Sequence, residues 1–195
     1  MDDEAAIDRI YGKLVRGQLG EADLSARGIA ALVGRTTGSV YHRWGSLDGL
    51  LFALSQRGFA DLGVLLLSSW DRTHDLGACA TAYVTFALDH PALYSLMFER
   101  RFDWAALRAF GSFDAKTPGS ELLVGVVCLL ESGGSKRALE DTRLLMAGLH
   151  GIVSLAASGR MNAGALGRTD REVALASATD LAARILSAKK KRVRT

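Results

Sequence analysis

Proline is nearly absent from this chain, since only Pro91 and Pro118 occur among its 195 residues. Proline removes a backbone donor and clashes with the preceding helical turn, so long stretches without it favour helices. Leucine and alanine dominate these stretches, while the alternating patterns typical of strands are scarce. We therefore predict an all-α fold of about nine to ten helices.

Apolar periodicity and capping residues divide the chain into predicted helices. The first covers residues 4–17. Ser25 is the predicted N-cap of the second, which ends at Gly34, and Thr36 precedes a short third helix that ends near residue 43. Ser46 caps a long fourth helix, predicted from Leu47 to about residue 70. The remaining predicted helices cover residues 75–89, 91–99, 104–110, 119–132, 137–159 and 170–188.

Cysteine, charge and hydropathy exclude several classes of protein. Cys79 and Cys128 are isolated, so neither structural zinc nor a disulfide framework is expected, and no metal or cofactor is predicted. The acidic N-terminus does not resemble a signal peptide, and no apolar run approaches the roughly 20 residues of a membrane helix. We therefore expect a cytoplasmic protein without a membrane partner.

The net charge is +3, but residues 189–194 carry five positive charges, which leaves −2 for the rest. We interpret this basic tail as a solvated end, with weak nucleic-acid contact as the alternative.

Residues 25–44 have the pattern of a helix-turn-helix. Ile29 and Val33 lie four residues apart on the first helix, and Val40 and Trp44 lie four apart on the second. A short link around Gly34 brings these pairs together at a steep angle, and the second helix becomes a recognition helix for the major groove of DNA.

The polar side of this segment suits a phosphate backbone. Residues 25–46 contain no Asp or Glu, and three arginines give the segment a charge of +3. Backbone amides at the start of the recognition helix can also bind phosphate. The predicted DNA-binding residues are Ser25, Arg27, Arg35, Thr36, Thr37, Gly38, Ser39, Tyr41, His42 and Arg43.

The same stretch resembles the DNA-binding signature of the TetR family of repressors. The resemblance is carried by Ile29, Ala30, Gly34, Thr36, Thr37, Gly38, Ser39, Val40, Tyr41, Trp44, Ser46, Leu50 and Leu51. It implies that Tyr41 touches phosphate and that Thr37 and Gly38 approach bases. The chain departs from the pattern at Arg35, where the family prefers valine, and at Arg43, which replaces a common histidine. It departs again at Leu47, which replaces a phosphate-binding lysine.

A second resemblance concerns the C-terminal part. Residues 90–98 and the run from Gly148 to Gly151 look like elements of a TetR-type C-terminal domain of the Trp-His-Gly (WHG) group, with Leu149 in place of tryptophan. The family's fold implies a helix-turn-helix domain over residues 1–46, a ligand-binding and dimerisation domain over residues 47–188, and here a basic tail over residues 189–195.

This domain implies a homodimer and a small-molecule effector, in addition to double-stranded DNA, and the aromatic candidate residues named below would suit a mostly apolar effector. Stripes of mostly small residues on two predicted helices are expected at the dimer interface, with an ordinary intrachain core as the alternative. The stripes contain Leu144, Ala147, Gly148, Gly151, Ser154, Leu155, Ala174, Ala178, Leu181, Ala182 and Ile185. The candidate ligand-pocket residues are Tyr83, Phe86, Tyr94, Met97, Phe98, Phe102, Trp104, Phe110 and His150, which could equally form core.

Two other functions compete with a ligand-controlled repressor. An enzyme is not expected, because the four histidines are scattered and no nucleophile, paired-carboxylate or phosphate-loop motif occurs. A helical protein-interaction bundle that has lost DNA binding is the closer alternative, since Leu47 and the acidic N-terminus weaken the case for DNA.

Overall fold

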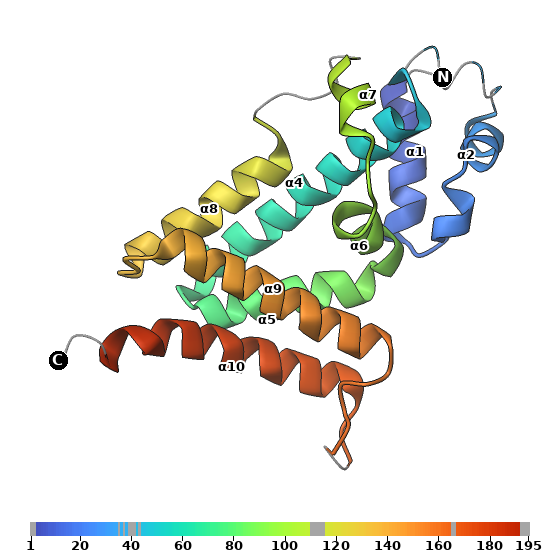
Figure 1. Cartoon of the computed structure of the whole chain (residues 1–195). Coiled ribbons are helices and arrows are strands. Elements are labelled where there is room, and N and C mark those ends of the chain that lie inside the picture. Colours follow the sequence, from blue (N-terminus) through green and yellow to red (C-terminus); the bar gives the residue numbers. More distant parts are fainter. Residues whose placement is uncertain are drawn as a thin grey trace. The chain divides into compact units, whose positions relative to one another are not determined.

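The computed structural model of the chain describes residues 3–34, 36, 38, 42, 44–109, 116–164 and 167–191 (Figure 1). Within these ranges all regular structure is helical, which confirms the predicted all-α class. The elements are α1 (Asp3–Val15), the 3-10 helix η1 (Glu21–Asp23), α2 (Ala26–Val33), α4 (Leu47–Thr73), α5 (Leu76–Asp89), α6 (Pro91–Phe98), α7 (Trp104–Ala109), α8 (Pro118–Ser132), α9 (Ala138–Ala157) and α10 (Asp170–Lys191).

The predicted helix ends agree with these bounds to within three residues. The sequence did not predict η1, and α10 continues to Lys191, three residues into the predicted basic tail. Of the predicted third helix, residues 38 and 42 are helical, and Thr36 precedes them outside the helix. The other residues of the predicted third helix, 37, 39–41 and 43, lie outside the described residues.

The chain divides into two compact units. The first contains residues 1–60 and 90–120, and the second contains residues 61–89 and 121–195. Helix α4 supplies residues to both units. These units describe packing and not function, so the predicted functional boundary at residue 46 stays a prediction.

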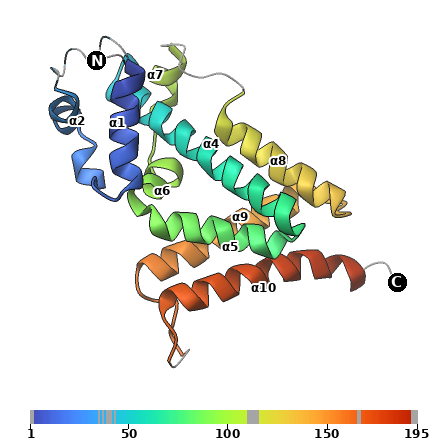
Figure 2. The same cartoon turned by 180° about the vertical axis from the view of Figure 1, so that it is seen from behind.

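In the first unit, α1 packs against α2 and α6, and α6 also contacts η1 (Figure 2). The unit buries leucine and isoleucine from four helices: Ile10, Leu14, Ile29, Leu50, Leu54 and Leu93. His90 Nδ1 lies 2.9 Å from the carbonyl oxygen of Val15, at the end of α1. Because a carbonyl oxygen only accepts, this bond requires the proton on Nδ1.

Helix α4 is long and apolar enough by composition to cross a membrane, but its most apolar window is 44% buried within the protein. Leu50, Leu51, Leu54 and Leu62 are fully buried, so α4 is a core helix of this fold. Its glycines allow close approach: a Cβ at Gly58 would lie 2.5 Å from Met97 Sδ in α6. Close packing at Gly58 therefore supports this glycine-containing helix within the first unit.

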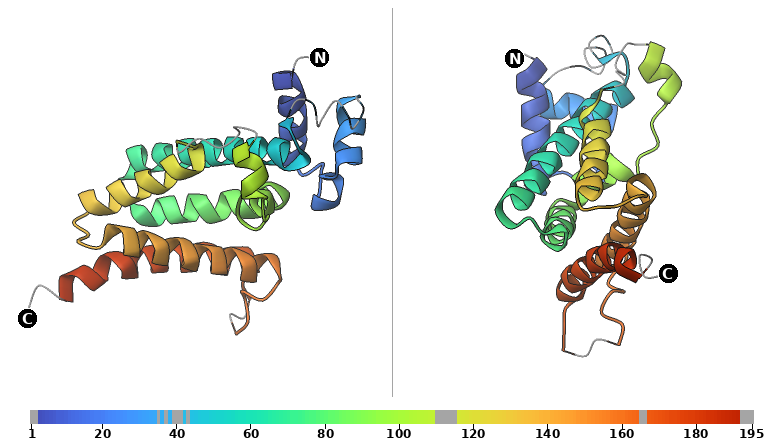
Figure 3. Two further views of the ribbon diagram at one scale, coloured as in Figure 1. Left: turned by 45° about the horizontal axis from the view of Figure 1, so that its top comes forward. Right: turned by 90° about the vertical axis from the view of Figure 1, so that its left-hand side faces the viewer.

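In the second unit, α10 lies along α5 and α9 (Figure 3). Ala174, Ala178 and Ala182 of α10 have no exposed surface. Arg171 of α10 pairs with Asp89 of α5, with 2.7 Å between Nη1 and Oδ1. Small side chains thus bring α10 close to its neighbours, while polar pairs form at the exposed margin.

Candidate nucleic-acid interface

The predicted caps fix both ends of α2. The hydroxyl of Ser25 accepts a hydrogen bond from the Gly28 amide at 3.2 Å. Gly34 follows the helix in the left-handed conformation, with φ of +65°, and its N–H reaches the carbonyls of Ala30 and Ala31. Glycine adopts this conformation without steric cost, so the helix ends there and the chain turns. The predicted helix between Ser25 and Gly34 is therefore confirmed.

Gly28 has a structural role that the sequence did not reveal. A Cβ at this position would lie 2.4 Å from the carbonyl oxygen of Asp23. Any larger residue would push α2 away from the last residue of η1. A glycine in the first turn of a helix carries no sequence signal for such a close approach, because the contact depends on how the preceding loop folds.

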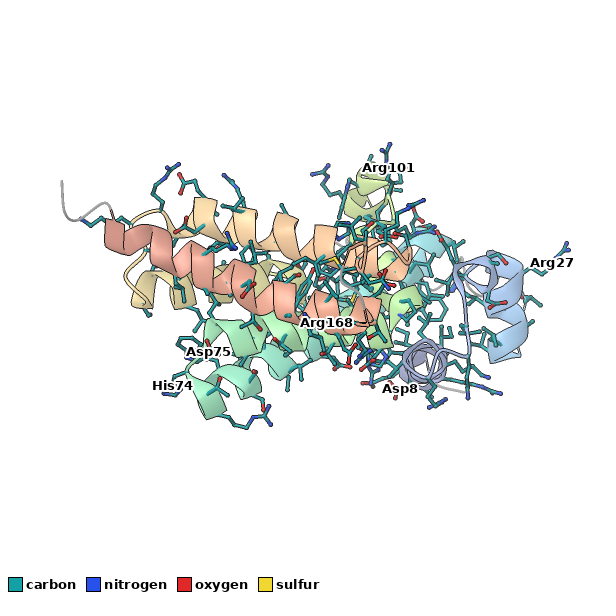
Figure 4. All side chains as sticks on the ribbon, turned by 90° about the horizontal axis from the view of Figure 1, so that it is seen from below. Asp8, Arg27, His74, Asp75, Arg101 and Arg168 are labelled. Atoms are coloured by element: carbon teal, nitrogen blue, oxygen red, sulfur yellow. The ribbon has the colours of Figure 1, made fainter. Side chains whose placement is uncertain are left out.

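The described members of the predicted DNA-binding set are all exposed. They are Ser25, Arg27, Thr36, Gly38 and His42. Arg27 extends away from α2 into the surroundings (Figure 4), while Ile29 and Val33 on the same helix are buried. Helix α2 thus has a buried apolar face, and its Arg27 side chain is free to reach a phosphate.

Five members of the set lie outside the described residues: Arg35, Thr37, Ser39, Tyr41 and Arg43. Val40, predicted to anchor the recognition helix, also lies outside them. Trp44, the other predicted anchor, is half-buried.

The junction between Trp44 and α4 is tightly packed. Ser46 Oγ accepts from the Gly49 amide at 3.0 Å, which confirms the predicted cap of α4. A Cβ at Gly49 would lie 2.0 Å from the Trp44 carbonyl oxygen, so only glycine fits there. Leu47, which stands where the TetR pattern has a phosphate-binding lysine, is half-buried.

The candidate ligand-pocket residues are divided between the two compact units. Tyr83 and Phe86 are buried in α5, and His150 is half-buried in α9, all in the second unit. In the first unit, Tyr94 and Met97 of α6 are buried, Phe98 and Phe102 are half-buried, and Trp104 is 46% exposed. Phe110 lies outside the described residues.

Within the first unit the aromatic members pack on one another. The ring centroids of Tyr94 and Phe98 are 4.7 Å apart, and those of Phe102 and Trp104 are 5.9 Å apart. These contacts are typical of core packing. The ligand pocket therefore stays a prediction.

The predicted dimer residues fall into two groups. On α9, Leu144 is 60% exposed and Leu155 is 46% exposed, and Ala147 and Ser154 are exposed with them. Gly148, Gly151 and Leu181 are half-buried.

The α10 group is covered within a single chain. Ala174, Ala178 and Ala182 are 0% exposed within a single chain, and Ile185 is 6% exposed. This burial favours the alternative of an intrachain core for these four residues, and their place at a dimer interface stays a prediction. A stripe of small residues looks the same in sequence whether its neighbour belongs to the same chain or to another one.

The histidines serve separate elements. His42 is exposed near the recognition segment, and His74 Nδ1 lies 2.9 Å from the Trp70 carbonyl oxygen. His90 holds the end of α1, as described above. No group of three or more metal-ligating side chains lies together in the described ranges.

The described part of the chain is all-helical, and the described polar residues of the acid-free segment are exposed. Residues 76–181, more than half of the chain, match the family described as "Tetracyclin repressor-like, C-terminal domain". The chain therefore belongs to the tetracyclin repressor (TetR) family. The match does not single out the WHG group.

Two solved structures share the fold. A protein of unknown function from Rhodococcus sp. RHA1 has a TM-score of 0.64 and 22% identity, with 90% of this chain and 93% of that chain covered. SCO4313, described as a candidate regulatory protein, has a TM-score of 0.61 and 18% identity, with 93% of this chain and 98% of that chain covered. The comparison with curated proteins gave no significant match.

Proposed function

We propose that this chain is a ligand-responsive transcriptional repressor that binds palindromic operator DNA as a homodimer through residues 25–44. The observation that carries the proposal is the acid-free segment, whose described polar side chains are exposed beside a buried apolar face. Membership of the TetR family and the likeness to SCO4313 support it. The protein acts in the cytoplasm, not as an enzyme, and needs no metal or cofactor.

DNA binding would depend on phosphate contacts for position and on base contacts for sequence. Arg27, Arg43 and the Tyr41 hydroxyl are assigned to phosphates, and Thr37 and Gly38 to the major-groove edges of bases. A two-fold dimer presents two recognition helices, which matches a palindromic site. The exposed α9 stripe that includes Leu144 and Leu155 is assigned to that dimer.

A small, mostly apolar effector would bind in the region of residues 47–188 and release the DNA. It can do so only by binding the DNA-free conformation more tightly than the DNA-bound one. The same coupling requires that operator DNA weaken effector binding by the same factor.

Fluorescence anisotropy with a labelled duplex from the region upstream of the protein's own gene tests DNA binding. The Tyr41→Phe, Arg43→Ala double variant should bind about tenfold more weakly, with a salt slope shallower by about 1. Arg160→Ala removes the same charge from the second compact unit and should bind like the wild type. Wild-type affinity in the double variant would contradict the assigned contacts. Wild-type protein without salt-dependent binding would favour the helical interaction bundle.

Sedimentation velocity tests the dimer. Leu144→Glu places a charge on the exposed α9 stripe and should shift the protein towards the monomer. Leu139→Glu alters another exposed leucine of α9, which is 42% exposed and outside the predicted stripe, and should leave the dimer intact. Equal behaviour of the two variants would contradict the assigned interface.

A further inference from the structure

The link between α6 and α7 is tied to the first turn of α4. Arg100 Nη2 donates to Asp48 Oδ1 at 2.8 Å. The backbone amide of Asp103 donates to Asp48 Oδ2 at 3.0 Å. Both carboxylate oxygens of Asp48 are therefore used by one short segment that lies more than 50 residues away in the sequence, within the same compact unit. We name the Asp48–Arg100 pair with the Asp103 amide the α4 clasp.

The α4 clasp is more sheltered than the other ion pairs described here. The side chains of Arg100 and Asp48 are 26% and 22% exposed, whereas those of Arg171 and Asp89 are 46% and 45% exposed. Burial by itself opposes the charge of Asp48. The hydrogen bonds from Arg100 and the Asp103 amide, together with the Arg100 charge, outweigh burial and lower the pKa of Asp48. The carboxylate therefore stays ionised at neutral pH, where it also complements the positive end of the α4 dipole.

The link is fixed by further contacts. The Asp103 carboxylate caps α7, because its Oδ1 accepts from the amides of Ala105 and Ala106 at 3.0 Å each. The Phe102 ring meets Phe52 of α4 edge to face, with 5.7 Å between centroids. The Arg100 guanidinium lies 5.8 Å from the Phe102 ring centroid. Residues 100–103 are thus held against the first turns of α4 by hydrogen bonds and ring contacts.

The first turn of α4 also contacts Trp44, the last residue of the recognition segment (residues 36–44). Gly49, the neighbour of Asp48, lies under the Trp44 carbonyl and is bonded to Ser46. A tilt of this turn would therefore move Trp44, where the recognition segment ends. Trp44 thus lies only four positions before the carboxylate that Arg100 holds.

The clasp is not built for maximal stability. Arg100 Nε is buried and makes no hydrogen bond within the described structure, which costs free energy. The desolvation cost of a buried ion pair can cancel its attraction, so such a pair adds little net stability. This combination fits a role in orientation.

We propose that the α4 clasp is a positioning device that holds the start of α4, and with it the end of the recognition segment, in the orientation that binds DNA. Arg100 is a positioning residue that raises DNA affinity without touching DNA. The inference rests on the proposed function in that DNA affinity is one of its two readouts.

DNA anisotropy across a salt series is the first readout. Arg100→Gln should weaken binding about tenfold with an unchanged salt slope, because no phosphate contact is lost. Arg101→Gln removes the same charge from the adjacent exposed residue, which extends away from the fold (Figure 4), and should bind within about twofold of the wild type. Asp48→Asn should match Arg100→Gln, and the double variant should lose no more than either single variant. Additive losses, a shallower slope for Arg100→Gln, or equal binding by the Arg100 and Arg101 variants would overturn the proposal.

Hydrogen exchange of the free protein is the second readout, and it needs no DNA. Amides of residues 44–52 should exchange about tenfold faster in Arg100→Gln than in Arg101→Gln, while those of α10 remain unchanged. If Arg100→Gln fails to fold, Arg100→Lys keeps the charge and should give a smaller increase in the same amides. Equal exchange in the Arg100 and Arg101 variants would overturn the clasp even if DNA binding stands. Wild-type protein that binds no duplex would refute the proposed function, and exchange would still decide the clasp.

Discussion

Helices α8 and α10 differ in how well their composition predicts their burial. Helix α8 has Leu or Val at seven of its 15 positions, yet Leu130 is its one buried residue. Helix α10 is far more polar, yet Ala174, Ala178 and Ala182 are completely buried. The more apolar helix is therefore the less buried one.

The reason is the fit between neighbouring helices. Small residues let α10 approach its neighbours: a Cβ at Gly148 of α9 would lie 2.5 Å from Leu181 Cδ2 of α10. On α8, in contrast, Val124 is 60% exposed and Leu123 is 36% exposed. Protein interiors are close-packed, so shape decides burial as much as hydropathy does.

Shortening the buried leucine of α8 gives the largest expected effect. Leu130→Ala should lower the free energy of unfolding by about 2–5 kcal/mol, because it removes buried methyl groups and leaves a cavity. Val124→Ala on the same helix should change it by less than about 0.5 kcal/mol. Urea denaturation followed by circular dichroism measures both. A similar loss in the two variants would mean that Val124 is covered in solution.

Enlarging a buried alanine of α10 comes next. Ala178→Leu should cost about 1–3 kcal/mol, because the added atoms have no room beside α5 and α9. The matched variant Ala176→Leu alters an exposed position two residues earlier and should be nearly neutral. The same denaturation experiment applies, and equal stability of the two variants would refute the close approach of α10.

The two half-buried glycines of α9 test the contact between α9 and α10 with smaller substitutions. Gly151→Ala should stabilise the protein by up to about 1 kcal/mol, since nothing lies within 4 Å of the added Cβ and alanine favours helix. Gly148→Ala should gain less or lose stability, because Leu181 must move. Thermal unfolding compares them, and an equal gain would show that Leu181 yields without cost.

The smallest expected effect concerns the N-terminal caps of α10 and α8, whose contributions to stability should respond differently to acid. Glu172 Oε2 accepts from the Thr169 amide at 2.7 Å and from its hydroxyl, and these bonds lower the pKa of Glu172. In α8 the corresponding partner of the Thr117 amide is the Ser120 hydroxyl, at 2.9 Å.

A lowered pKa in the folded state means stability that is present above the ordinary pKa of glutamate and lost as the pH falls through the folded value. The difference in melting temperature between wild type and Glu172→Ala should therefore shrink below about pH 4. The difference for Ser120→Ala should not change with pH, because a hydroxyl does not titrate there. A melting series from pH 7 to pH 3 checks both, and a pH-independent Glu172→Ala difference would contradict the cap.

Local signals predicted most of the fold. Ser25, Gly34 and Ser46 mark helix ends by hydrogen bonds within a few residues, and the structure has them where the sequence indicates. Contacts between distant segments left no such signal. The pairing of Asp48 with Arg100 could not be read from spacing.

The candidate site was predicted unevenly for the same reason. Exposure of Arg27 and His42 follows from local polarity and is present. The α10 alanines were assigned to a partner because periodicity gives a face but not the neighbour that covers it. The aromatic residues of the predicted pocket present the same problem, because buried rings have one pattern whether they line a cavity or fill a core.

The first compact unit is assembled from two separate pieces of chain, residues 1–60 and 90–120, with His90 fastened to Val15. A fragment that stops at residue 46 would leave the sides of α1 and η1 that meet α6 bare to water. Exchanging the proposed DNA-binding segment between relatives would therefore require transplanting α6 and α7 together with the first sixty residues. Under the proposed function, DNA specificity is therefore not transferable with residues 1–46 alone.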